Sequence, residues 1–383
     1  NREIIHNKKV LPPLKRMKKL LTLALGIVLS ASAYAQTPTL QEVLGKYFLV
    51  GAAVDTNFTQ GNDPQAEALC RRQFNSVVAE NCMKGEIIHP AVNYFYWRDA
   101  DKLVDWAEQN GKAVIGHCLV WHSQPPAWMF TYENGDTVSR DDLIGRMYNH
   151  IMTVASRYRG RIKGWDVVNE VLNDDGTMRQ TPYYTIIGPE YIEMAFRFAH
   201  EADPDAELYI NDYSLSNPAK REAMCRLVRS LQQKGCRVDA IGMQSHNGFN
   251  YPDYTEYEKS IEAFAGLGVK VLITELDINM LPNPNDFSGA EISQKFKFEK
   301  ALNPYKNGLT KKGQRLFDQR YLDLFKIYER HKDQIGRITF WGLTDRHSWL
   351  NDWPVKGRTN YPLLFDRNYA PKPVLNDILK LFE

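Results

Sequence analysis

The chain has 383 residues, of which 43% are hydrophobic, so it can form one large domain or two ordinary ones with a substantial core. Its formal net charge is +2, but the first 35 residues hold seven basic groups and one acidic group. Without them the chain carries 41 basic and 45 acidic groups, a net charge of −4, which is no basis for expecting nucleic acid as a partner.

The N-terminal segment has the pattern of a secretory signal. Four basic residues between positions 15 and 19 precede the apolar run Leu20–Leu29, and small residues follow in Ala33-Tyr34-Ala35. The apolar run is too short to span a membrane comfortably. Because Met17 is the first methionine, the residues before it are expected to be upstream sequence. We therefore expect residues 1–35 to be upstream residues and a signal peptide, and the mature protein to be exported, periplasmic or extracellular, without a membrane anchor.

From Tyr47 onward, short apolar runs alternate with amphipathic stretches, as in a series of strand-helix units. The predicted strands are Tyr47–Val54, Ser76–Ala79, Ala113–Val120, Ile162–Val168, Leu208–Ile210, Ala240–Met243, Val271–Thr274 and Ile338–Gly342. The predicted helices are Gln65–Phe74, Arg98–Asn110, Asp141–Tyr158, Pro189–Ala202, Lys220–Gln233, Tyr254–Ala265, Gln314–His331 and Pro373–Phe382. Ser139 is the expected N-cap of the third helix, and Gly111 ends the second.

Eight such units in about 350 residues, without an interdomain linker, favour a (β/α)8 barrel, an α/β fold of the TIM-barrel type. We predict a single catalytic domain over residues 36–383. A doubly wound open sheet is the alternative. No repeat, low-complexity tract or glycine-rich phosphate loop interrupts the pattern.

Most of the predicted strands end in residues that bind ligands or transfer protons. These residues are Glu80, Asn81, His117, His122, Asn169, Glu170, Tyr213, Gln244, His246, Glu275 and Trp341. In a parallel barrel the carboxyl ends of all strands open on one face, which is where substrates bind. The sequence therefore predicts one polar site assembled from residues that are far apart in the chain.

Glu170 and Glu275 close the fourth and seventh predicted strands and form the kind of carboxyl pair that glycoside hydrolysis requires. One carboxyl must be protonated near neutral pH to donate to the leaving oxygen, while the other must be ionised to attack or stabilise the anomeric carbon. Asn169 and the apolar strand behind it favour a raised pKa for Glu170, whereas His246 and Asp277 favour the anion of Glu275. For either carboxyl taken alone, a buried salt bridge is the competing interpretation.

The histidines and cysteines do not match a metal framework. His117, His122 and His246 are an alternative set of ligands, but the chain has neither an HExxH helix nor tight ligand spacing. We expect these histidines to bond sugar hydroxyls, and we expect no metal and no other cofactor. Five cysteines in an exported protein allow at most two disulfides, and their pairing stays open. The cysteines are Cys70, Cys82, Cys118, Cys225 and Cys236.

Eight segments between about Leu40 and the C-terminus resemble glycoside hydrolase family 10, the endo-β-1,4-xylanases, in the order of that family. They read AENCMK, GHCLVWHSQPPAW, GWDVVNE, NDY, GMQSH, ITELDI, FWGLTDRHSWL and PLLFD. The resemblance implies a (β/α)8 barrel and a retaining, double-displacement hydrolysis of internal xylan bonds. Glu170 matches the family's acid/base residue, and Glu275 matches its nucleophile.

The resemblance also implies a set of sugar-binding residues. Those that match subsites on the non-reducing side of the cleaved bond are Glu80, Asn81, Lys84, His117, Trp121, Gln124, Asn169, Gln244, His246, Trp341 and Trp349. Tyr213 is similar to a family aromatic residue on the leaving-group side. The expected partners are therefore xylan and xylo-oligosaccharides, with no nucleic acid, and the expected state is a monomer.

Two other functions stay open: an enzyme of the same scaffold that acts on another β-1,4-glycan, and a non-catalytic glycan-binding protein. The chain also departs from the family pattern in two places. A long polar insertion lies between Leu281 and Lys311, directly after the nucleophile strand, and is expected to rim the cleft. Near the end, Val374-Leu375 replaces the pair of residues that the family pattern has after Lys372-Pro373, which is remote from the chemistry.

Overall fold

The computed structural model describes residues 38–383, and Leu40–Glu383 form one compact unit. The signal segment predicted for residues 1–35 lies outside the described residues. Among the helices of the described part, none has the length and apolar content that crossing a membrane requires. All five cysteines lie in this unit, and each is a free, buried thiol.

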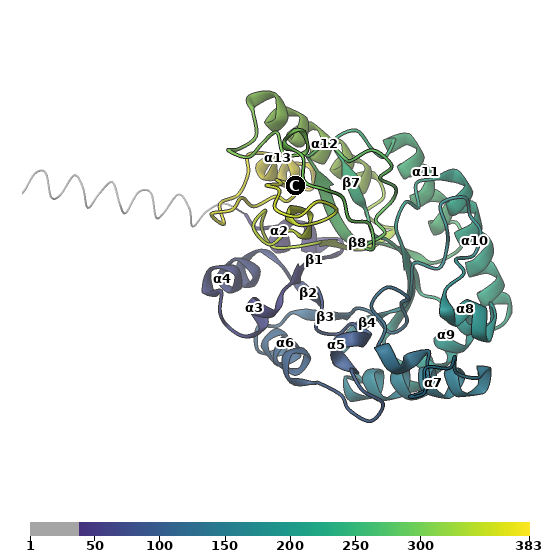
Figure 1. Cartoon of the computed structure of the whole chain (residues 1–383). Helices are drawn as coiled ribbons and strands as arrows, with labels where there is room; N and C mark the ends of the chain where they lie inside the picture. The colour runs from purple at the N-terminus through teal and green to yellow at the C-terminus, as the bar shows by residue number, and fades with distance from the viewer. Residues whose placement is uncertain (1–37) are drawn as a thin grey trace, which may run out of the picture. The chain divides into compact units, whose positions relative to one another are not determined.

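Eight parallel strands form a closed ring, which confirms the predicted (β/α)8 barrel and excludes the open sheet. Neighbouring strands pair in chain order, β6 pairs with β8, and β9 returns to β1. A short ninth segment, β7, pairs with the outer half of β8 (Figure 1). The strands are β1 (Leu49–Val54), β2 (Ser76–Ala79), β3 (Ala113–Gly116), β4 (Ile162–Asn169), β5 (Glu207–Asp212), β6 (Ala240–Met243), β7 (His246–Gly248), β8 (Lys270–Asn279) and β9 (Ile335–Phe340).

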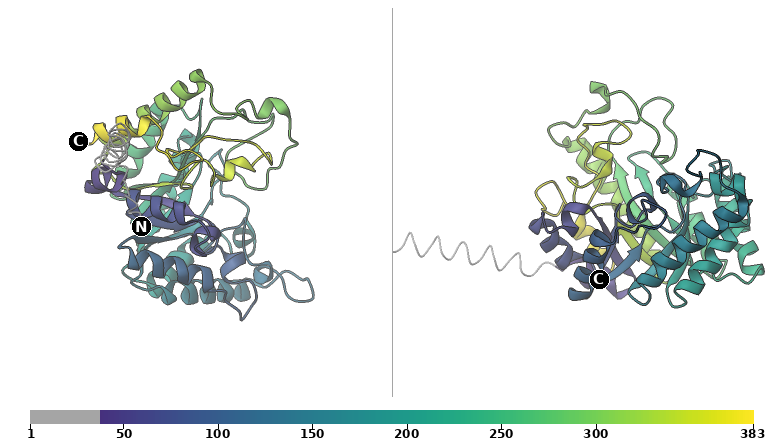
Figure 2. Two further views of the ribbon diagram at one scale, coloured as in Figure 1. Left: turned by 90° about the vertical axis from the view of Figure 1, so that its left-hand side faces the viewer. Right: turned by 60° about the horizontal axis from the view of Figure 1, so that its bottom comes forward.

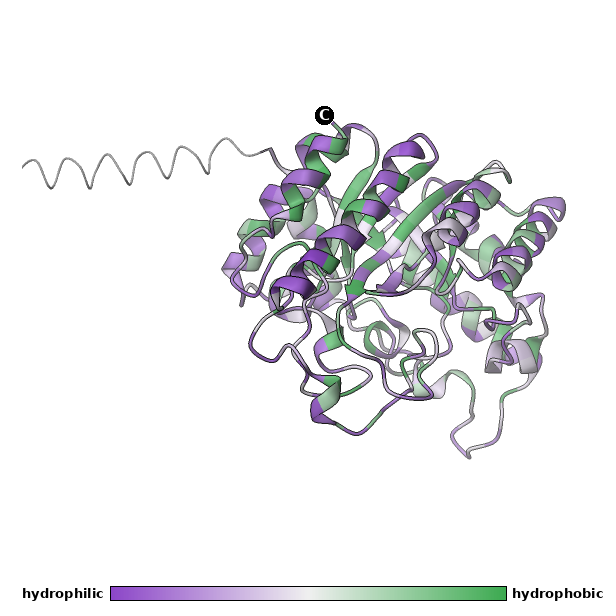
Figure 3. Ribbon diagram, turned by 90° about the horizontal axis from the view of Figure 1, so that it is seen from above, coloured by the Kyte–Doolittle hydropathy of each residue, from purple (hydrophilic) through white to green (hydrophobic). Residues whose placement is uncertain are grey.

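Amphipathic helices surround the ring and turn their apolar faces toward it. Figure 3 shows largely green strands inside and helices that carry purple, hydrophilic residues on their outer faces. The helices are α2 (Leu40–Val43), α3 (Thr56–Thr59), α4 (Pro64–Gln73), α5 (Gly85–Ile88), α6 (Arg98–Gln109), α7 (Arg140–Arg157), α8 (Pro182–Ile187), α9 (Tyr191–Ala202), α10 (Pro218–Gln233), α11 (Tyr254–Ala265), α12 (Lys311–Arg330) and α13 (Val374–Leu381). Single 3-10 turns are η1 (Leu44–Lys46), η2 (Ala127–Met129), η3 (Lys300–Leu302) and η4 (Trp349–Asn351).

The predicted strands and helices are present, with boundaries shifted by a few residues. The helix α7 begins after Ser139, whose side chain accepts a hydrogen bond from the Asp142 amide, as predicted for its N-cap. The helix α12 begins three residues earlier than predicted, because Thr310 caps it by accepting from the Gly313 amide. The sequence pattern missed the short helices α2, α3, α5 and α8, which at four to six residues are too short to display a helical period.

Two hydrophobic cores hold the barrel. The larger lies between the ring and the helices, and the smaller fills the inside of the ring. The inner core consists of Ala53, Val78, Ile115, Tyr209, Ala240, Leu272 and Trp341. Gly116 shows how tight the outer packing is, because a Cβ there would lie 2.0 Å from the buried Trp165 ring. Only glycine leaves room for that indole at this point of β3.

The inner core also forms the floor of the functional face. Arg337, on β9, is 2% exposed and donates a hydrogen bond of 3.2 Å to the Tyr209 hydroxyl, so the inside of the ring also contains a buried polar contact. The carboxyl ends of the strands open above the inner core into long loops. Figure 2 (left) shows these loops at one end of the barrel and the C-terminus at the other.

Candidate active site

The strand ends converge on one cavity of about 170 Å³ at the loop end of the barrel. Thirteen of the fourteen residues predicted for the site line it. They are Glu80, Asn81, Lys84, His117, Trp121, Gln124, Asn169, Glu170, Gln244, His246, Glu275, Trp341 and Trp349. Ala290 and Ile292 of the insertion complete the wall. The fourteenth predicted residue, Tyr213, lies in an adjoining cavity.

Glu170 directly follows β4, and its side chain is 3% exposed. Trp121 Nε1 donates to its Oε2 at 2.9 Å, and Gln244 Nε2 donates to its Oε1 at 3.1 Å. Burial raises the pKa of Glu170 to about 7, and the charge of Asp212 adds to this effect. A substantial fraction of Glu170 is therefore protonated at neutral pH and can donate a proton.

The backbone of Glu170 is also unusual. Its φ of 60° lies in the left-handed region, which a residue with a Cβ adopts at a cost of about 1–3 kcal/mol. The Glu170 amide donates to the Asn211 carbonyl at 2.8 Å, which holds this conformation against β5. The strand thus ends in a sharp turn that directs the carboxyl group into the cavity.

Glu275 lies within β8 and is 5% exposed. One oxygen of its carboxyl group has an amide donor, and the other has a histidine beside it. Asn211 Nδ2 donates to Oε1 at 2.8 Å, and His246 Nε2 lies 3.0 Å from Oε2. Burial opposes ionisation, but the hydrogen bond from His246 and the charge of His117 hold the pKa of Glu275 below its usual value. This carboxyl group is therefore an anion at neutral pH, the opposite state to Glu170.

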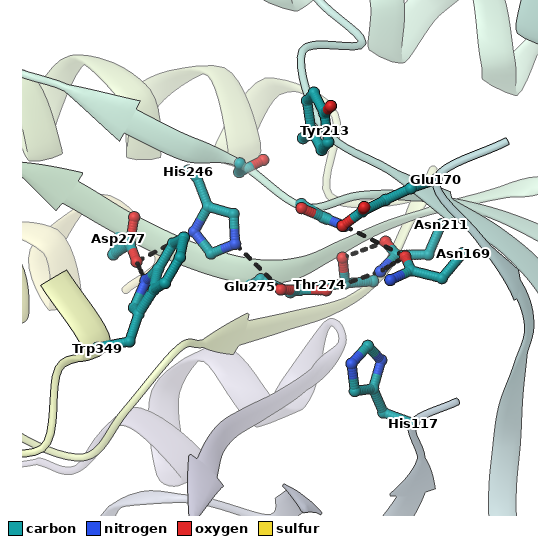
Figure 4. Close-up of polar contacts among 12 residues, drawn as sticks. His117, Asn169, Glu170, Asn211, Tyr213, His246, Thr274, Glu275, Asp277 and Trp349 are labelled. Carbon is teal, nitrogen blue, oxygen red and sulfur yellow. Dashed lines mark hydrogen bonds and ion pairs between the residues drawn. The ribbon is translucent and has the colours of Figure 1, made fainter. Parts of the chain in front are cut away.

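A buried relay holds the histidine beside Glu275. His246 Nδ1 lies 3.1 Å from Asp277 Oδ2, and Trp349 Nε1 donates to the same oxygen at 2.8 Å (Figure 4). Burial alone would lower the pKa of His246, but the charges and hydrogen bonds of Asp277 and Glu275 raise it to about 10. His246 is thus a cation placed between two carboxylates, and with Asp277 it favours the Glu275 anion, which is the influence that the sequence predicted for this pair.

A second layer of polar residues lies below the pair, inside the barrel. His117 Nδ1 is 2.9 Å from Asp166 Oδ2, and the Asn211 amide donates to the same oxygen at 3.1 Å. Thr274 donates to Asn211 Oδ1 at 2.6 Å, which orients that amide toward Glu275. Burial raises the pKa of Asp166 to about 6, although His117 opposes this effect. These contacts set the position of the Asn211 amide before any ligand binds.

The far wall of the cavity comes from the loops after β2 and β3. Lys84 Nζ donates to Asn81 Oδ1 at 3.0 Å and to Gln124 Oε1 at 2.8 Å, and its ammonium lies 5.1 Å from the Trp121 ring centre. Burial raises the pKa of Glu80 on the same wall. A fixed cation, amides and indole rings are the groups that bind sugar hydroxyls and the apolar faces of sugar rings.

A larger cavity of about 630 Å³ adjoins the first and shares Gln244, His246 and Ala290 with it. Tyr213 lies there at the edge of Glu170, as Figure 4 shows. Its hydroxyl accepts a hydrogen bond of 2.6 Å from Arg179, and Lys220 Nζ lies 3.9 Å from the ring centre. The site therefore extends to both sides of the carboxyl pair.

Two clusters of the described residues have donor atoms within 4.8 Å of one another, close enough to share a metal ion. They are His117 with Asp166 and Glu275, and His122 with Glu170 and Glu291. Each of three carboxylates already has a donor. Asp166 is paired with His117, Glu275 accepts from the Asn211 amide, and Glu291 accepts from the Arg179 guanidinium. An ion would have to displace these donors, so we assign the clusters no metal. The ligand set of three histidines considered above is not brought together.

The pattern of glycosyl hydrolase family 10 matches residues 39–381, almost the entire described chain. The chain belongs to this family. The endo-1,4-beta-xylanase A of Xylanibacter ruminicola is 60% identical over 369 residues, which cover 96% of this chain and 100% of that protein. A thermostable celloxylanase of Thermoclostridium stercorarium is 40% identical over 350 residues, which cover 88% and 85% of the two chains. The solved structure of a family 10 endoxylanase from a sugarcane soil metagenome superposes with a TM-score of 0.85 at 41% identity, covering 91% and 100%.

The structure adds residues to the site to which the sequence gave no role. Asn211, the first residue of the NDY segment, bridges toward Glu275 and Asp166, and its place at the end of β5 was the signal that could have found it. Arg179 and Glu291 come from loops with no periodic pattern, and they meet beside Glu170 only in the folded chain. Sequence spacing carries no information about such contacts.

Proposed function

We propose that this protein is a retaining endo-1,4-β-xylanase that hydrolyses internal bonds of xylan with Glu170 as acid/base and Glu275 as nucleophile. One observation carries the proposal: two buried carboxyl groups face one cavity, one with a raised pKa and one with a lowered pKa. Such a division between acid and nucleophile is what a glycosidase needs.

In the first step, the Glu275 carboxylate attacks the anomeric carbon and forms an ester bond to it. The glycosidic carbon–oxygen bond breaks, and Glu170 transfers its proton to the departing oxygen. The His246 cation keeps Glu275 ionised up to the attack, and its hydrogen bond orients the attacking carboxylate. Trp121 and Gln244 hold the Glu170 carboxyl group at the other side of the bond.

In the second step, Glu170 is ionised and acts as a base. It removes a proton from a water molecule, whose oxygen bonds to the anomeric carbon while the ester to Glu275 breaks. Two inversions at the same carbon retain its configuration. The proton gained from water returns Glu170 to its starting state, so atoms and charge balance over the cycle.

The two adjoining cavities support action on internal bonds. A chain that is cut internally must extend from the cleavage point in both directions, and the cavities meet at Gln244, His246 and Ala290. The smaller cavity, with Trp341, Trp349 and Lys84, is the proposed place of the sugars on the non-reducing side. The larger one, with Tyr213, is the proposed place of the leaving group.

The replacement Glu170→Gln tests the assignment of the acid. It should abolish xylan hydrolysis, yet still release the phenol from an aryl xylobioside with a good leaving group, because that oxygen needs no proton. Glu299→Gln, an exposed change in the insertion, is the control and should behave as wild type. An equal loss on both substrates would refute the acid assignment, and NMR of the first product anomer tests retention independently.

A second candidate, activity on a β-1,4-glucan, is favoured by one relative named a celloxylanase. Glucose adds a hydroxymethyl group, and the cavity of about 170 Å³ is walled by Trp341, Trp349 and Ile292, which favours the smaller xylose. Release of reducing sugar from xylan and from carboxymethylcellulose, compared at equal mass, separates the two. Greater release from cellulose would overturn the preference for xylan.

We also propose that the protein is exported and acts as a monomer. The signal pattern of residues 1–35 supports export, since it combines a basic start, a short apolar run and a small-residue cleavage site. N-terminal sequencing of the protein recovered from outside the cytoplasm should begin near residue 36. Recovery of the uncleaved chain in the cytoplasm would contradict the proposal, and light scattering tests the monomer.

A further inference from the structure

The insertion after the nucleophile strand crosses the mouth of the barrel. We call residues 281–310, which join β8 to α12, the strap, and residues 289–292 its tip. In the closed ring β8 and β3 are four strands apart in either direction, so they lie on opposite sides. Yet Glu291 of the tip reaches His122, which follows β3, with 3.6 Å between Oε2 and Nε2. The strap therefore passes over the cavity.

The tip is attached to the loops on the far side. Glu291 Oε2 accepts from Arg179 Nη1 at 3.0 Å, and its Oε1 accepts from the Ser293 amide at 3.2 Å. Gly289 has a φ of 59° and packs directly on Tyr213, since a Cβ there would lie 2.6 Å from the ring. The residues on either side of Glu291, Ala290 and Ile292, line the cavity. The tip is thus built into the site rather than resting on its rim.

The strap base is also held by the loop after β9. Arg358 donates to the Pro282 carbonyl at 3.2 Å, and the Phe296 amide donates to the Pro354 carbonyl at 3.0 Å. Contacts on both sides of the tip leave Glu291 with a defined position. One donor atom each of Glu291, His122 and Glu170 lies within 4.8 Å of the other two.

Charged and titratable groups face Glu170 from each element around it. In addition to Glu291 these are His122 after β3, Arg179 after β4, and Asp212 and Tyr213 at the end of β5. His246 on β7 and Glu275 on β8 line the same cavity as Glu170. Asp212 is bonded to Lys220 at 2.9 Å, and Glu275 is bonded to His246. Among the ion pairs of the described residues, Glu291 is the acidic partner of both Arg179 and His122.

We propose that Glu291 is a positioning residue that keeps Glu170 ready to donate its proton, by neutralising the two basic side chains that flank it. This inference rests on the proposed role of Glu170 as the acid. Glu291 itself is an anion throughout the working range, because the nearby His122, the Ser293 amide and the charge of Arg179 lower its pKa to about 2.

The direction of the effect follows from the charges alone. Removing one negative charge within 4.8 Å of Glu170 makes its surroundings more positive, which favours its anion and lowers its pKa. A general acid must be protonated, so activity falls as the pH rises through its pKa. Loss of Glu291 should therefore move the alkaline limb of the pH–rate profile to lower pH.

Glu291→Gln keeps the side-chain shape and removes the charge, and kcat/KM on a xylo-oligosaccharide is measured across the pH range. We expect about a tenfold loss above the wild-type alkaline midpoint, and little change well below it. An aryl xylobioside with a good leaving group should show a much smaller loss, because it needs no acid. Glu299→Gln, in the same strap but exposed, is the matched control and should leave the profile unmoved.

Arg179→Gln provides a test of opposite sign. It removes a positive charge near Glu170, so the alkaline limb should move to higher pH whatever the level of activity. A loss of activity in Glu291→Gln that is uniform across pH, or a limb that moves upward, would overturn the inference and leave the tip a purely structural element.

The variant Glu170→Gln separates this inference from the proposed function. On the xylo-oligosaccharide that variant should be inactive, while it still releases the phenol from the aryl xylobioside. If it hydrolyses the oligosaccharide with an alkaline limb like that of the wild type, Glu170 is not the acid and the proposed function fails. If it is inactive as expected but the limb does not move in Glu291→Gln, the failure belongs to Glu291 alone.

Discussion

Asp277 offers a test of how the nucleophile is held as an anion. Its Oδ2 accepts from both His246 Nδ1 at 3.1 Å and Trp349 Nε1 at 2.8 Å, and the side chain is buried. Asp277→Asn keeps the size of the side chain but removes the charge that holds His246 as a cation. The pKa of His246 should then fall, and Glu275 should lose the positive charge that stabilises its anion.

The magnitude follows from the kind of bond that is lost. A hydrogen bond between charged groups contributes about 1.5–3 kcal/mol, which corresponds to a fall of about 10- to 100-fold in the rate of attack by Glu275. The nucleophile must be ionised, so activity is lost as the pH falls through its pKa. Because this pKa is held low in the folded protein, raising it moves the acid limb to higher pH.

The assay is kcat/KM for an aryl xylobioside with a good leaving group, for which the attack by Glu275 is the step observed. The profile of Asp277→Asn is compared with that of Asp205→Asn, an exposed change. We expect a lower plateau and an acid limb at higher pH in the first variant only. An acid limb that stays in place, with the fold intact by circular dichroism, would refute the role given to the His246–Asp277 pair.

Two further predictions concern stability. Gly116→Ala places a methyl group 2.0 Å from the Trp165 ring, and such overpacking should lower the free energy of unfolding by about 1–3 kcal/mol in urea titrations; an unchanged midpoint would contradict the packing described. Lys372→Met leaves the buried Asp345 carboxylate without the ammonium that lies 2.9 Å away and should destabilise the protein by about 3–5 kcal/mol. The double change Lys372→Met with Asp345→Asn should recover much of that loss in thermal melting, and a double variant as unstable as the single one would show that charge burial is not the cause.

The barrel itself could be predicted because its signals are local. Apolar runs of strand length alternate with helical periods, and caps such as Ser139 mark where helices begin. The parallel topology then places Glu170 and Glu275 on one face, although more than a hundred residues separate them. Most of the candidate site followed from this one topological step together with the family motifs.

The protonation states of Glu170 and Glu275 could not be predicted fully from the positions of the two residues in the fold. The neighbouring Asn169 suggested a raised pKa for Glu170, and His246 suggested a lowered pKa for Glu275. The structure adds the groups that set these values, including Asp212 beside Glu170 and Asn211 beside Glu275. Asp212 and Asn211 act on these carboxyl groups from a different strand. The distance between such residues in the fold cannot be predicted from their order in the chain.

The sequence by itself determined the fold class, the face that carries the site and the two carboxyl groups on it, because strand and helix periods are local and parallel strands share one open end. It also marked the insertion between Leu281 and Lys311 as exceptional in length. Only the tertiary structure decided that this segment crosses the barrel mouth and brings Glu291 to Arg179, a contact between residues 112 positions apart. Electrostatic interactions of that kind depend on distances of a few ångströms in the folded chain, which no local pattern encodes.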